Sequence, residues 1–172
     1  MAFALQAGLM ALALVALIAA MLSDFTSMRI PNLFSVGVAL LFLPVAILAD
    51  LPWQAIAIDH LATAAGILLV GILVFARGLM GGGDVKLLVA VGLWTGWKPL
   101  PEYLLLTALL GGVVALFALS LRRPPGSLLL VWLPVLRHGF GDGKNVPYGL
   151  AIGAAALWMA PRLDTFPKAW LP

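Results

Sequence analysis

Long apolar runs separated by short polar loops dominate this sequence, and each run predicts a helix. We expect a single domain over residues 1–172, because no polar domain and no repeat interrupts the runs. A helix needs about 20 apolar residues to span a bilayer, so the pattern predicts an all-α membrane bundle of about six transmembrane helices. The predicted helices cover residues 2–22, 33–49, 56–76, 85–97, 103–121 and 146–161. The fourth is short, and we expect it to tilt or to cross only part of the hydrocarbon core.

The composition supports a lipid environment. Hydrophobic residues make up 63% of the chain and charged residues 10%, whereas soluble domains carry roughly a quarter charged residues. The net charge of +3 is spread thinly over the loops, so it does not indicate nucleic acid binding. The absence of cysteine excludes disulfides, cysteine-type zinc sites and a thiol nucleophile. His60 and His138 are far apart in sequence and form no ligand motif, so we expect no metal.

Basic residues in the loops predict which way the bundle faces. Seven fall on one side of the membrane: Arg29, Arg77, Lys86, Arg122, Arg123, Arg137 and Lys144. Three fall on the other: Lys98, Arg162 and Lys168. By the positive-inside rule the N-terminus is outside, and the loops with Asp24 and Asp84 are cytoplasmic.

The first run is as long as a full span and no basic segment precedes it, so we expect a retained helix rather than a cleaved signal. Tryptophans near the outer helix ends are predicted to lie at the membrane interface: Trp53, Trp94, Trp97, Trp158 and Trp170.

The segment Gly81-Gly82-Gly83-Asp84 places a carboxylate beside an apolar helix. Burying an ionised group costs free energy, so an aspartate in such a segment indicates a site. The three glycines lower helix propensity, let the backbone turn sharply, and leave room for a substrate backbone and water. The alternative is that Asp84 only caps the next helix, a position that aspartate favours. Lys86 is most simply a cationic anchor at the membrane surface; the alternative is that it keeps Asp84 ionised.

Asp24, at the end of the first apolar run, provides a second carboxylate. Two carboxylates can hydrolyse a peptide bond without a metal: the ionised one takes a proton from water, and the protonated one donates to the scissile carbonyl. Like charges close together keep such a pair singly protonated. The alternative is that Asp24 is an ordinary loop residue before Ile30-Pro31-Asn32, where proline suits the first helical turn. Both aspartates fall on the same predicted side, which favours a shared site.

A second G-x-G-D occurs at Gly139-Phe140-Gly141-Asp142. It lies in a more polar loop and no apolar helix follows it, so we interpret Asp142 as a solvated turn residue. The same loop, residues 122–146, contains an apolar stretch at 128–136 that is too short to span. We expect this stretch to lie in the interface or to pack on the bundle, and a partly re-entrant path stays open. The remaining acidic residues are expected to be interfacial caps on the outer face: Asp50, Asp59, Glu102 and Asp164.

Together these motifs resemble the type IV prepilin peptidase family, in the small form associated with Flp/Tad-type pili. The resemblance rests on Asp24 followed by Ile30–Asn32, on Gly81-x-Gly83-Asp84 within 81–87, and on Val146-Pro147-Tyr148-Gly149 at the start of the last helix. The order and spacing of the three motifs, with the six-helix layout, cover nearly the whole chain.

The resemblance implies an intramembrane aspartic endopeptidase of the bacterial inner membrane. Such an enzyme removes the basic leader from prepilin or pseudopilin precursors at the cytoplasmic face. The resemblance implies Asp24 and Asp84 as the catalytic pair, with Gly81, Gly83 and Lys86 supporting the loop that presents Asp84. Larger members add a cytoplasmic cysteine-containing domain and N-methylate the mature pilin. This chain has no cysteine, so we expect peptidase activity without methylation, without S-adenosylmethionine and without any other cofactor.

Two other functions are compatible with the two aspartates. One is a G-x-G-D protease of the presenilin or signal-peptide-peptidase type, which resembles this chain at one aspartate only. The other is a transporter or assembly subunit that uses Asp24 and Asp84 as an ion or proton relay. A relay needs carboxylates near the bilayer midplane or on both sides of the membrane, whereas these two are predicted at one interface.

Overall fold

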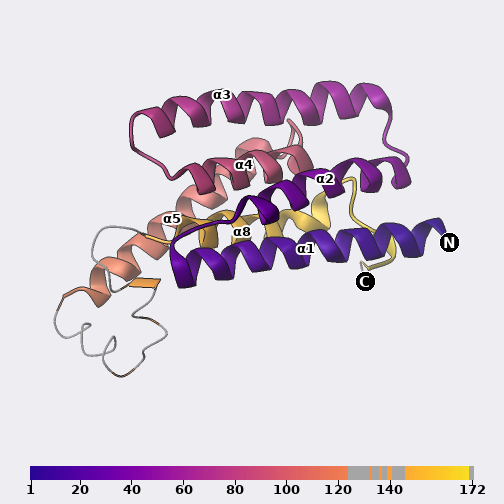
Figure 1. Cartoon of the computed structure of the whole chain (residues 1–172). Helices are drawn as coiled ribbons and strands as arrows, with labels where there is room; N and C mark the ends of the chain where they lie inside the picture. Colours follow the sequence, from indigo (N-terminus) through magenta and orange to yellow (C-terminus); the bar gives the residue numbers. More distant parts are fainter. Residues whose placement is uncertain (124–131, 133–135, 137–138, 141–145, 171–172) are drawn as a thin grey trace.

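The regular secondary structure of the described residues is helical throughout (Figure 1). In this computed structural model the described residues are 1–123, 132, 136, 139–140 and 146–170. The main helices are α1 (Ala2–Ser27), α2 (Asn32–Leu48), α3 (Ala62–Ala76), α4 (Gly82–Thr95), α5 (Leu100–Leu121) and α8 (Tyr148–Met159). A π-helix, η1 (Ala55–Leu61), runs directly into α3, and two short 3-10 helices follow α8: η2 (Ala160–Arg162) and η3 (Lys168–Trp170). The predicted all-α bundle of six helices is therefore confirmed.

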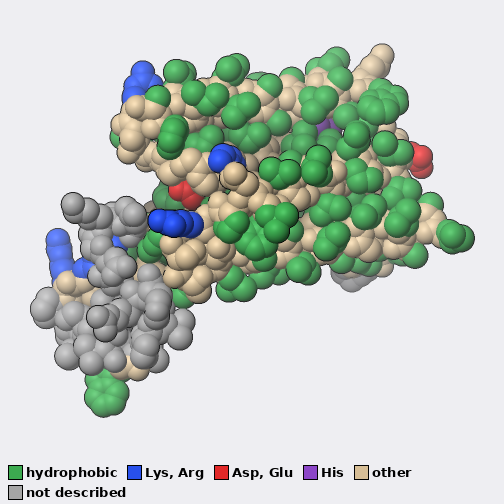
Figure 2. Space-filling model, viewed as in Figure 1, with side chains coloured by type: hydrophobic (Ala, Val, Ile, Leu, Met, Phe, Trp, Pro, Cys, Tyr) green, Lys and Arg blue, Asp and Glu red, His purple; other side chains and the backbone are tan. Residues whose placement is uncertain are grey.

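Three helices are long and apolar enough to cross a membrane: α1, the continuous helix Ala55–Ala76 formed by η1 and α3, and α5. Large apolar side chains point outward along them, and hydrophobic atoms cover much of the visible face of the molecule (Figure 2). In water such a surface would be costly, whereas against lipid tails it is not. The exposed apolar faces therefore fit a bundle whose solvent is lipid.

The short helices α4 and α8 occupy the middle of the bundle. α1 packs against α2 and α8, α4 lies between α2 and α3, and α5 packs mainly against α8 (Figure 1). Apolar side chains of α4 and α8, among them Leu87, Val91, Ile152 and Ala155, are almost fully buried. α1 ends where α4 and α8 begin, so three helix termini converge at one end of the bundle.

α1 continues to Ser27, past its predicted end at residue 22. The hydroxyls of Thr26 and Ser27 donate to the carbonyls of Leu22 and Ser23 in the preceding turn, at 2.8 and 2.7 Å. This back-bonding lets polar residues extend a helix without leaving their hydroxyls unpaired. The helix then stops at Met28, which adopts a left-handed conformation with φ 52°, and Asp24 is consequently a helical residue.

Trp94 is buried among the helices, so the prediction that it faces the membrane interface was wrong. Its side chain is 6% exposed, donates from Nε1 to the carbonyl of Val38 at 2.8 Å, and meets Phe42 edge-on. The reason is that α4 is shielded by its neighbours, so a tryptophan near its end is buried and needs a hydrogen-bond partner. The other four tryptophans of that prediction are exposed: Trp53, Trp97, Trp158 and Trp170.

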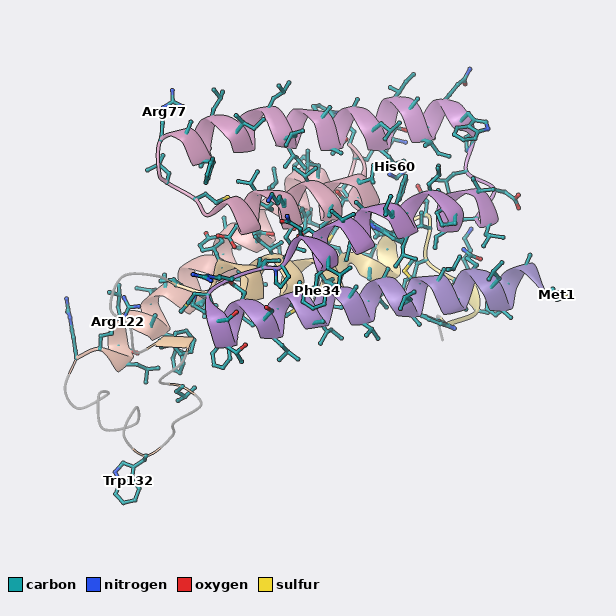
Figure 3. All side chains as sticks on the ribbon, in the orientation of Figure 1. Met1, Phe34, His60, Arg77, Arg122 and Trp132 are labelled. Carbon is teal, nitrogen blue, oxygen red and sulfur yellow. The ribbon has the colours of Figure 1, made fainter. Side chains whose placement is uncertain are left out.

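The two ends of the bundle differ in charge. Arg77 and Arg122 lie at the end where α1 finishes, and Met1 lies at the other (Figure 3). We call the first the aspartate end, because its acidic residues within the described part of the chain are Asp24 and Asp84. Basic residues of this end are Arg29, Arg77, Lys86, Arg122 and Arg123. Figure 2 shows an acidic side chain recessed among basic ones there. Both candidate carboxylates thus share one end of the molecule, as expected, while the side of the membrane that this end faces stays a prediction.

Candidate active site

Asp24 lies in the last turn of α1 and is only 6% exposed. Its Oδ2 accepts a hydrogen bond of 2.7 Å from the backbone N–H of Gly149. That N–H belongs to the first turn of α8, where backbone donors have no partner within the helix. The positive end of the α8 dipole also favours a negative charge at this place. The start of α8 therefore holds and stabilises the Asp24 carboxylate.

Gly149 has no space for a side chain. A Cβ there would lie 2.7 Å from Asp24 Oδ2 and 2.9 Å from Ile30 Cδ1. The motif Val146–Gly149 has no role that follows from the sequence alone. The signal was the Pro-Tyr-Gly sequence opening an apolar helix: Pro147 marks the start of α8, and the first-turn N–H groups of any helix lack a partner within it. A small residue two positions after such a proline allows a carboxylate from another helix to approach.

Asp84 lies in the first turn of α4 and is half-buried. Gly81 is the N-cap of this helix, and its backbone hydrogen-bonds to the Asp84 carboxylate. A carboxylate that reaches back to the N-cap N–H is half of a capping box. Asp84 thus caps α4 and also lines a cavity. The two interpretations of this residue are compatible, because the cap fixes the direction in which the carboxylate points.

The glycines before Asp84 provide close approach rather than an unusual backbone. Gly81 has φ −68°, which any residue adopts, so the sharp turn expected at this position is not what requires glycine. A Cβ on Gly81 would lie 3.0 Å from Asp84 Oδ2, and one on Gly83 would lie 3.2 Å from Ile30 Cβ. The positive φ in this loop occurs earlier, at Gly78 (69°). Gly81 leaves room for the carboxylate, and Gly83 lets Ile30 pack against the first turn of α4.

Asp24 and Asp84 line the same two hollows. The turn hollow, about 480 Å³, is bounded by both aspartates, Met28 and the segments 29–32 and 81–83. The α5 hollow, about 670 Å³, is bounded by both aspartates, Met28 and Gly81 together with the residues Gly78, Leu79, Met80, Ala115, Val146 and Tyr148. Both volumes accommodate water and a peptide segment. The sequence-predicted pair is therefore brought together at one water-accessible place.

The two carboxylates influence each other electrostatically. Asp84 lies outside the three membrane-crossing helices, and its burial, together with the negative charge of Asp24, raises the pKa of its carboxyl to about 6. The backbone hydrogen bond from Gly81 acts in the opposite direction but does not cancel the rise. Like charges that share a site keep one proton between them. One ionised and one protonated carboxyl is the arrangement that acid–base hydrolysis needs.

Lys86 joins the two segments that carry the aspartates. Its Nζ donates a hydrogen bond of 2.9 Å to Oδ1 of Asn32, the first residue of α2. Between the two described residues Lys86 and Asp84 there is no ion pair, so the geometry does not favour a direct role in keeping Asp84 ionised. Sequence reasoning placed Lys86 in support of the loop but did not identify Asn32 as its partner, because the two residues are 54 positions apart.

We expect Lys86→Met to lower kcat/KM for the substrate by roughly threefold to tenfold, the cost of one exposed charge-assisted hydrogen bond. Asn32→Ala should cause the same loss, the double variant no further loss, and Lys86→Arg little loss, because the hydrogen bond acts as one unit. Steady-state kinetics of the four variants would check this. Additive losses, or a pH profile displaced by Lys86→Met alone, would show instead that the lysine acts on Asp84 through its charge.

The other candidates do not join this site within the described residues. Asp142, Lys144 and the apolar stretch 128–136 lie outside the described residues, so the predictions for them stay predictions. His60 is buried near the opposite end of the bundle, where its Nδ1 pairs with the carbonyl of Leu93 at 2.9 Å. No group of His, Asp and Glu side chains in the described segments is arranged to hold a metal ion. Four acidic residues lie at the opposite end: Asp50, Asp59, Glu102 and Asp164.

The sequence of this chain matches a known protein family. The model of the Type IV leader peptidase family matches residues 11–116, which is more than half of the chain and includes Asp24 and Asp84. The chain belongs to the type IV leader peptidase family. Membership of this family and the three long apolar helices indicate a multi-pass bacterial membrane protein.

Three curated relatives, each named prepilin leader peptidase/N-methyltransferase, are similar to part of the chain. The chain is 43% identical over 60 residues to the protein of Pectobacterium carotovorum subsp. carotovorum. The matched segment covers 35% of this chain and 22% of the relative. The chain is 41% identical over 66 residues to the protein of Pseudomonas putida, a match that covers 33% of this chain and 23% of the relative. It is 36% identical over 81 residues to the protein of Aeromonas salmonicida, a match that covers 47% of this chain and 22% of the relative. The matched part is thus less than a quarter of each relative. No solved structure matches the chain.

Proposed function

We propose that this chain is an intramembrane aspartic endopeptidase that removes the basic leader from type IV prepilins or pseudopilins. The observation that carries the proposal is that Asp24 and Asp84, from two different helices, line the same two hollows. The family supplies the substrate class, because the relatives named above are prepilin leader peptidases. Only their leader-peptidase activity is proposed for this chain, on the strength of the shared part.

In the proposed reaction the ionised carboxylate takes a proton from a water molecule, and the water oxygen attacks the carbonyl carbon of the scissile bond. The protonated carboxyl donates its proton to the carbonyl oxygen, which stabilises the tetrahedral intermediate. The intermediate then collapses: the C–N bond breaks, the leaving amine takes the proton that came from water, and the carbonyl-oxygen proton returns to the second carboxylate. No bond forms between enzyme and substrate.

The geometry suggests which carboxylate starts in which form. For Asp84, burial and the negative charge of Asp24 outweigh the hydrogen bond from the Gly81 backbone. The raised pKa of Asp84 favours retention of the shared proton on that side. We therefore assign Asp24 as the base toward water and Asp84 as the acid toward the carbonyl, with the pair titrating as a unit.

The finer parts of the proposal concern location and product. The basic residues at the aspartate end support a site at the cytoplasmic face of the inner membrane, with the N-terminus outside, by the positive-inside rule. The three-motif pattern resembles the small form associated with Flp/Tad-type pili, which favours a precursor of that type as substrate. For these 172 residues we propose cleavage without N-methylation and without a cofactor, because they contain no cysteine-bearing domain.

An ion relay has less support than hydrolysis. Both aspartates lie at one end of the bundle, and the other acidic residues within the described segments lie near the opposite end. A relay across a membrane needs ionisable groups at intermediate depth. The middle of the bundle instead contains buried hydroxyls such as Thr107, and hydroxyls do not carry a mobile charge.

Co-expression with a pilin precursor, in a bacterium that lacks its own leader peptidase, tests the proposed function. We expect a faster-migrating pilin whose N-terminal sequence begins directly after the leader. Asp164→Asn, an exposed aspartate at the opposite end, is the matched control and should process normally. Unprocessed precursor for type IV and Flp/Tad pilins alike, with the protein present in the membrane, would contradict the proposal.

The pH dependence of cleavage follows from the Asp84 carboxyl. Because its pKa is raised to about 6, the shared proton is present below that pH and is lost as the pH rises through it. We therefore expect kcat/KM to fall on the alkaline side with an apparent pKa near 6. A pH–rate profile of purified protein measures this, and a rate that stays constant from mildly acidic to mildly alkaline pH would contradict it.

A further inference from the structure

One apolar side chain, that of Ile30, lies between the starts of α4 and α8. It is buried, with 8% of its surface exposed. At its base, a Cβ added to Gly83 would lie 3.2 Å from Ile30 Cβ and 3.6 Å from Ile30 Cγ1. At its tip, a Cβ added to Gly149 would lie 2.9 Å from Ile30 Cδ1. Ile30 therefore packs on the first turn of α4 with one part of its side chain and on the first turn of α8 with the other.

Each of these two glycines is linked directly to one of the carboxyls. Gly83 immediately precedes Asp84 in the first turn of α4. The backbone N–H of Gly149 donates to Oδ2 of Asp24 at 2.7 Å. A shift of either helix start relative to Ile30 consequently moves either the Asp84 carboxyl or the hydrogen-bond donor that holds Asp24.

The backbone on both sides of Ile30 keeps this side chain in place. Ser23, the residue before Asp24, donates from Oγ to the carbonyl of Arg29 at 2.9 Å, which ties the turn after α1 to the end of α1. Pro31 follows Ile30, and a residue before proline is restricted to extended backbone. Isoleucine is also branched at Cβ, which restricts its χ1 rotamers. Ile30 is therefore a stiff spacer that is anchored to the helix carrying Asp24.

Two roles are compatible with a side chain at this position. Ile30 lines the turn hollow, so one role is direct contact with a substrate. The other is control of the spacing between the starts of α4 and α8. The contacts favour the second role, because the base and the tip of the side chain both face glycines of the helix starts and little of its surface is left exposed.

We propose that Ile30 is a positioning residue, which sets the separation of the Asp24 and Asp84 carboxyls by acting as a spacer between the first turns of α4 and α8. The inference rests on the proposed function, since the separation matters only if the two carboxyls act on one substrate. It gives a role to the first residue of the Ile30–Asn32 motif. It also explains why the positions that face Ile30 on both helices are glycines.

The first test is Ile30→Val, which removes Cδ1 and keeps the Cβ that faces Gly83. We expect kcat to fall by about tenfold, since misplacing a catalytic group by roughly 1 Å costs about 10²-fold and the loss of one methyl group allows a smaller shift. KM should stay close to the wild-type value, and the loss should be the same for every precursor tested. Steady-state kinetics of purified protein with two or more precursors measure this.

Ile67→Val is the matched control for Ile30→Val. Ile67 Cδ1 also packs on a helical glycine, because a Cβ added to Gly92 of α4 would overlap it. This contact joins α3 to α4, and Ile67 lines neither hollow beside the aspartates. The control therefore loses the same methyl group from the same kind of contact, and its kcat should equal that of wild type.

The second test combines Ile30→Val with Gly149→Ala. The methyl group of Gly149→Ala needs space that Ile30 Cδ1 and Asp24 Oδ2 occupy. Removal of Cδ1 opens this space on the side away from Asp24, so the start of α8 can move without displacing the carboxylate. The double variant should cleave about tenfold faster than Gly149→Ala alone, a non-additive result expected only for residues in contact. Ile67→Val should give Gly149→Ala no such rescue.

Three results would overturn the inference: wild-type kcat for Ile30→Val, an equal loss for Ile67→Val, or a rise in KM that differs between precursors. A double variant no faster than Gly149→Ala would overturn it as well. Rescue of Gly149→Ala shows at the same time that the variants are folded. A failure of the proposed function is distinguishable from all of these, because the wild-type protein itself would then cleave no precursor.

Discussion

Asp24→Asn and Asp84→Asn are each expected to lower kcat for leader removal by about 10³-fold, the scale of a lost general acid or base. Asparagine has the shape of aspartate, and its Oδ1 can still accept the Gly149 N–H that the Asp24 carboxylate accepts now at 2.7 Å. The fold around the site is therefore kept. An amide, however, takes no proton from water and releases none at neutral pH. Single-turnover kinetics with purified variants and one precursor measure the loss.

The same substitution elsewhere provides the controls for this prediction. Asp164→Asn lies at the opposite end of the bundle and should be fully active. Asp142→Asn should also retain activity, because the second G-x-G-D is expected to be a solvated turn. Full processing by Asp84→Asn would refute the assignment of the pair. A loss confined to Asp142→Asn would show that the second carboxylate belongs to the other G-x-G-D.

Gly149→Ala is expected to reduce kcat by about 10²-fold, the scale that follows from misplacing a catalytic group by roughly 1 Å. The new methyl group would lie 2.7 Å from Asp24 Oδ2 and 3.0 Å from Asp24 Cβ, so the carboxylate or the first turn of α8 has to move. Moving either lengthens the Gly149–Asp24 hydrogen bond and changes the approach to Asp84. The substrate KM should change much less, since the hollows themselves stay open.

Gly112→Ala is the matched control for Gly149→Ala. A Cβ on Gly112 meets nothing within 4 Å, and alanine favours a helix over glycine by about 1 kcal/mol. The control should therefore be as active as wild type and at least as stable. Because Gly149 is also helical, lost helix propensity cannot explain a defect there. Wild-type kcat for Gly149→Ala would contradict the role given to the start of α8.

The parts of the fold that the sequence predicted are those set by local apolar patterning. Each long apolar run became a helix, since in lipid the backbone must satisfy its hydrogen bonds within the segment. The helix ends were harder to predict, because they depend on individual side chains. α1 passes its predicted end through the hydroxyls of Thr26 and Ser27, and α4 begins at Gly82. Both shifts place the aspartates on helices rather than in loops.

The parts that could not be predicted are contacts between residues distant in sequence. Asp24 and Asp84 could be paired from the charge of the loops, but the Gly149 donor lies 125 positions from Asp24. Glycine at 81 and 83 was expected to allow a sharp turn and to leave room for substrate and water, whereas the structure shows that it leaves room for the side chains of Asp84 and Ile30. The burial of Trp94 depends on the position of α4 between α2 and α3. In each case the deciding information is the arrangement of helices, which periodicity alone does not contain.

The most direct measurement of the central claim is the mass of the products when the purified chain, in liposomes, is incubated with one pilin precursor and a metal chelator. The account predicts two fragments from a single cut after the basic leader. Their masses should sum to the precursor plus one water, the new N-terminus should be unmethylated, and the rate should be the same with and without chelator. An intact precursor after incubation with folded protein, or cleavage that the chelator stops, would contradict a two-aspartate hydrolase.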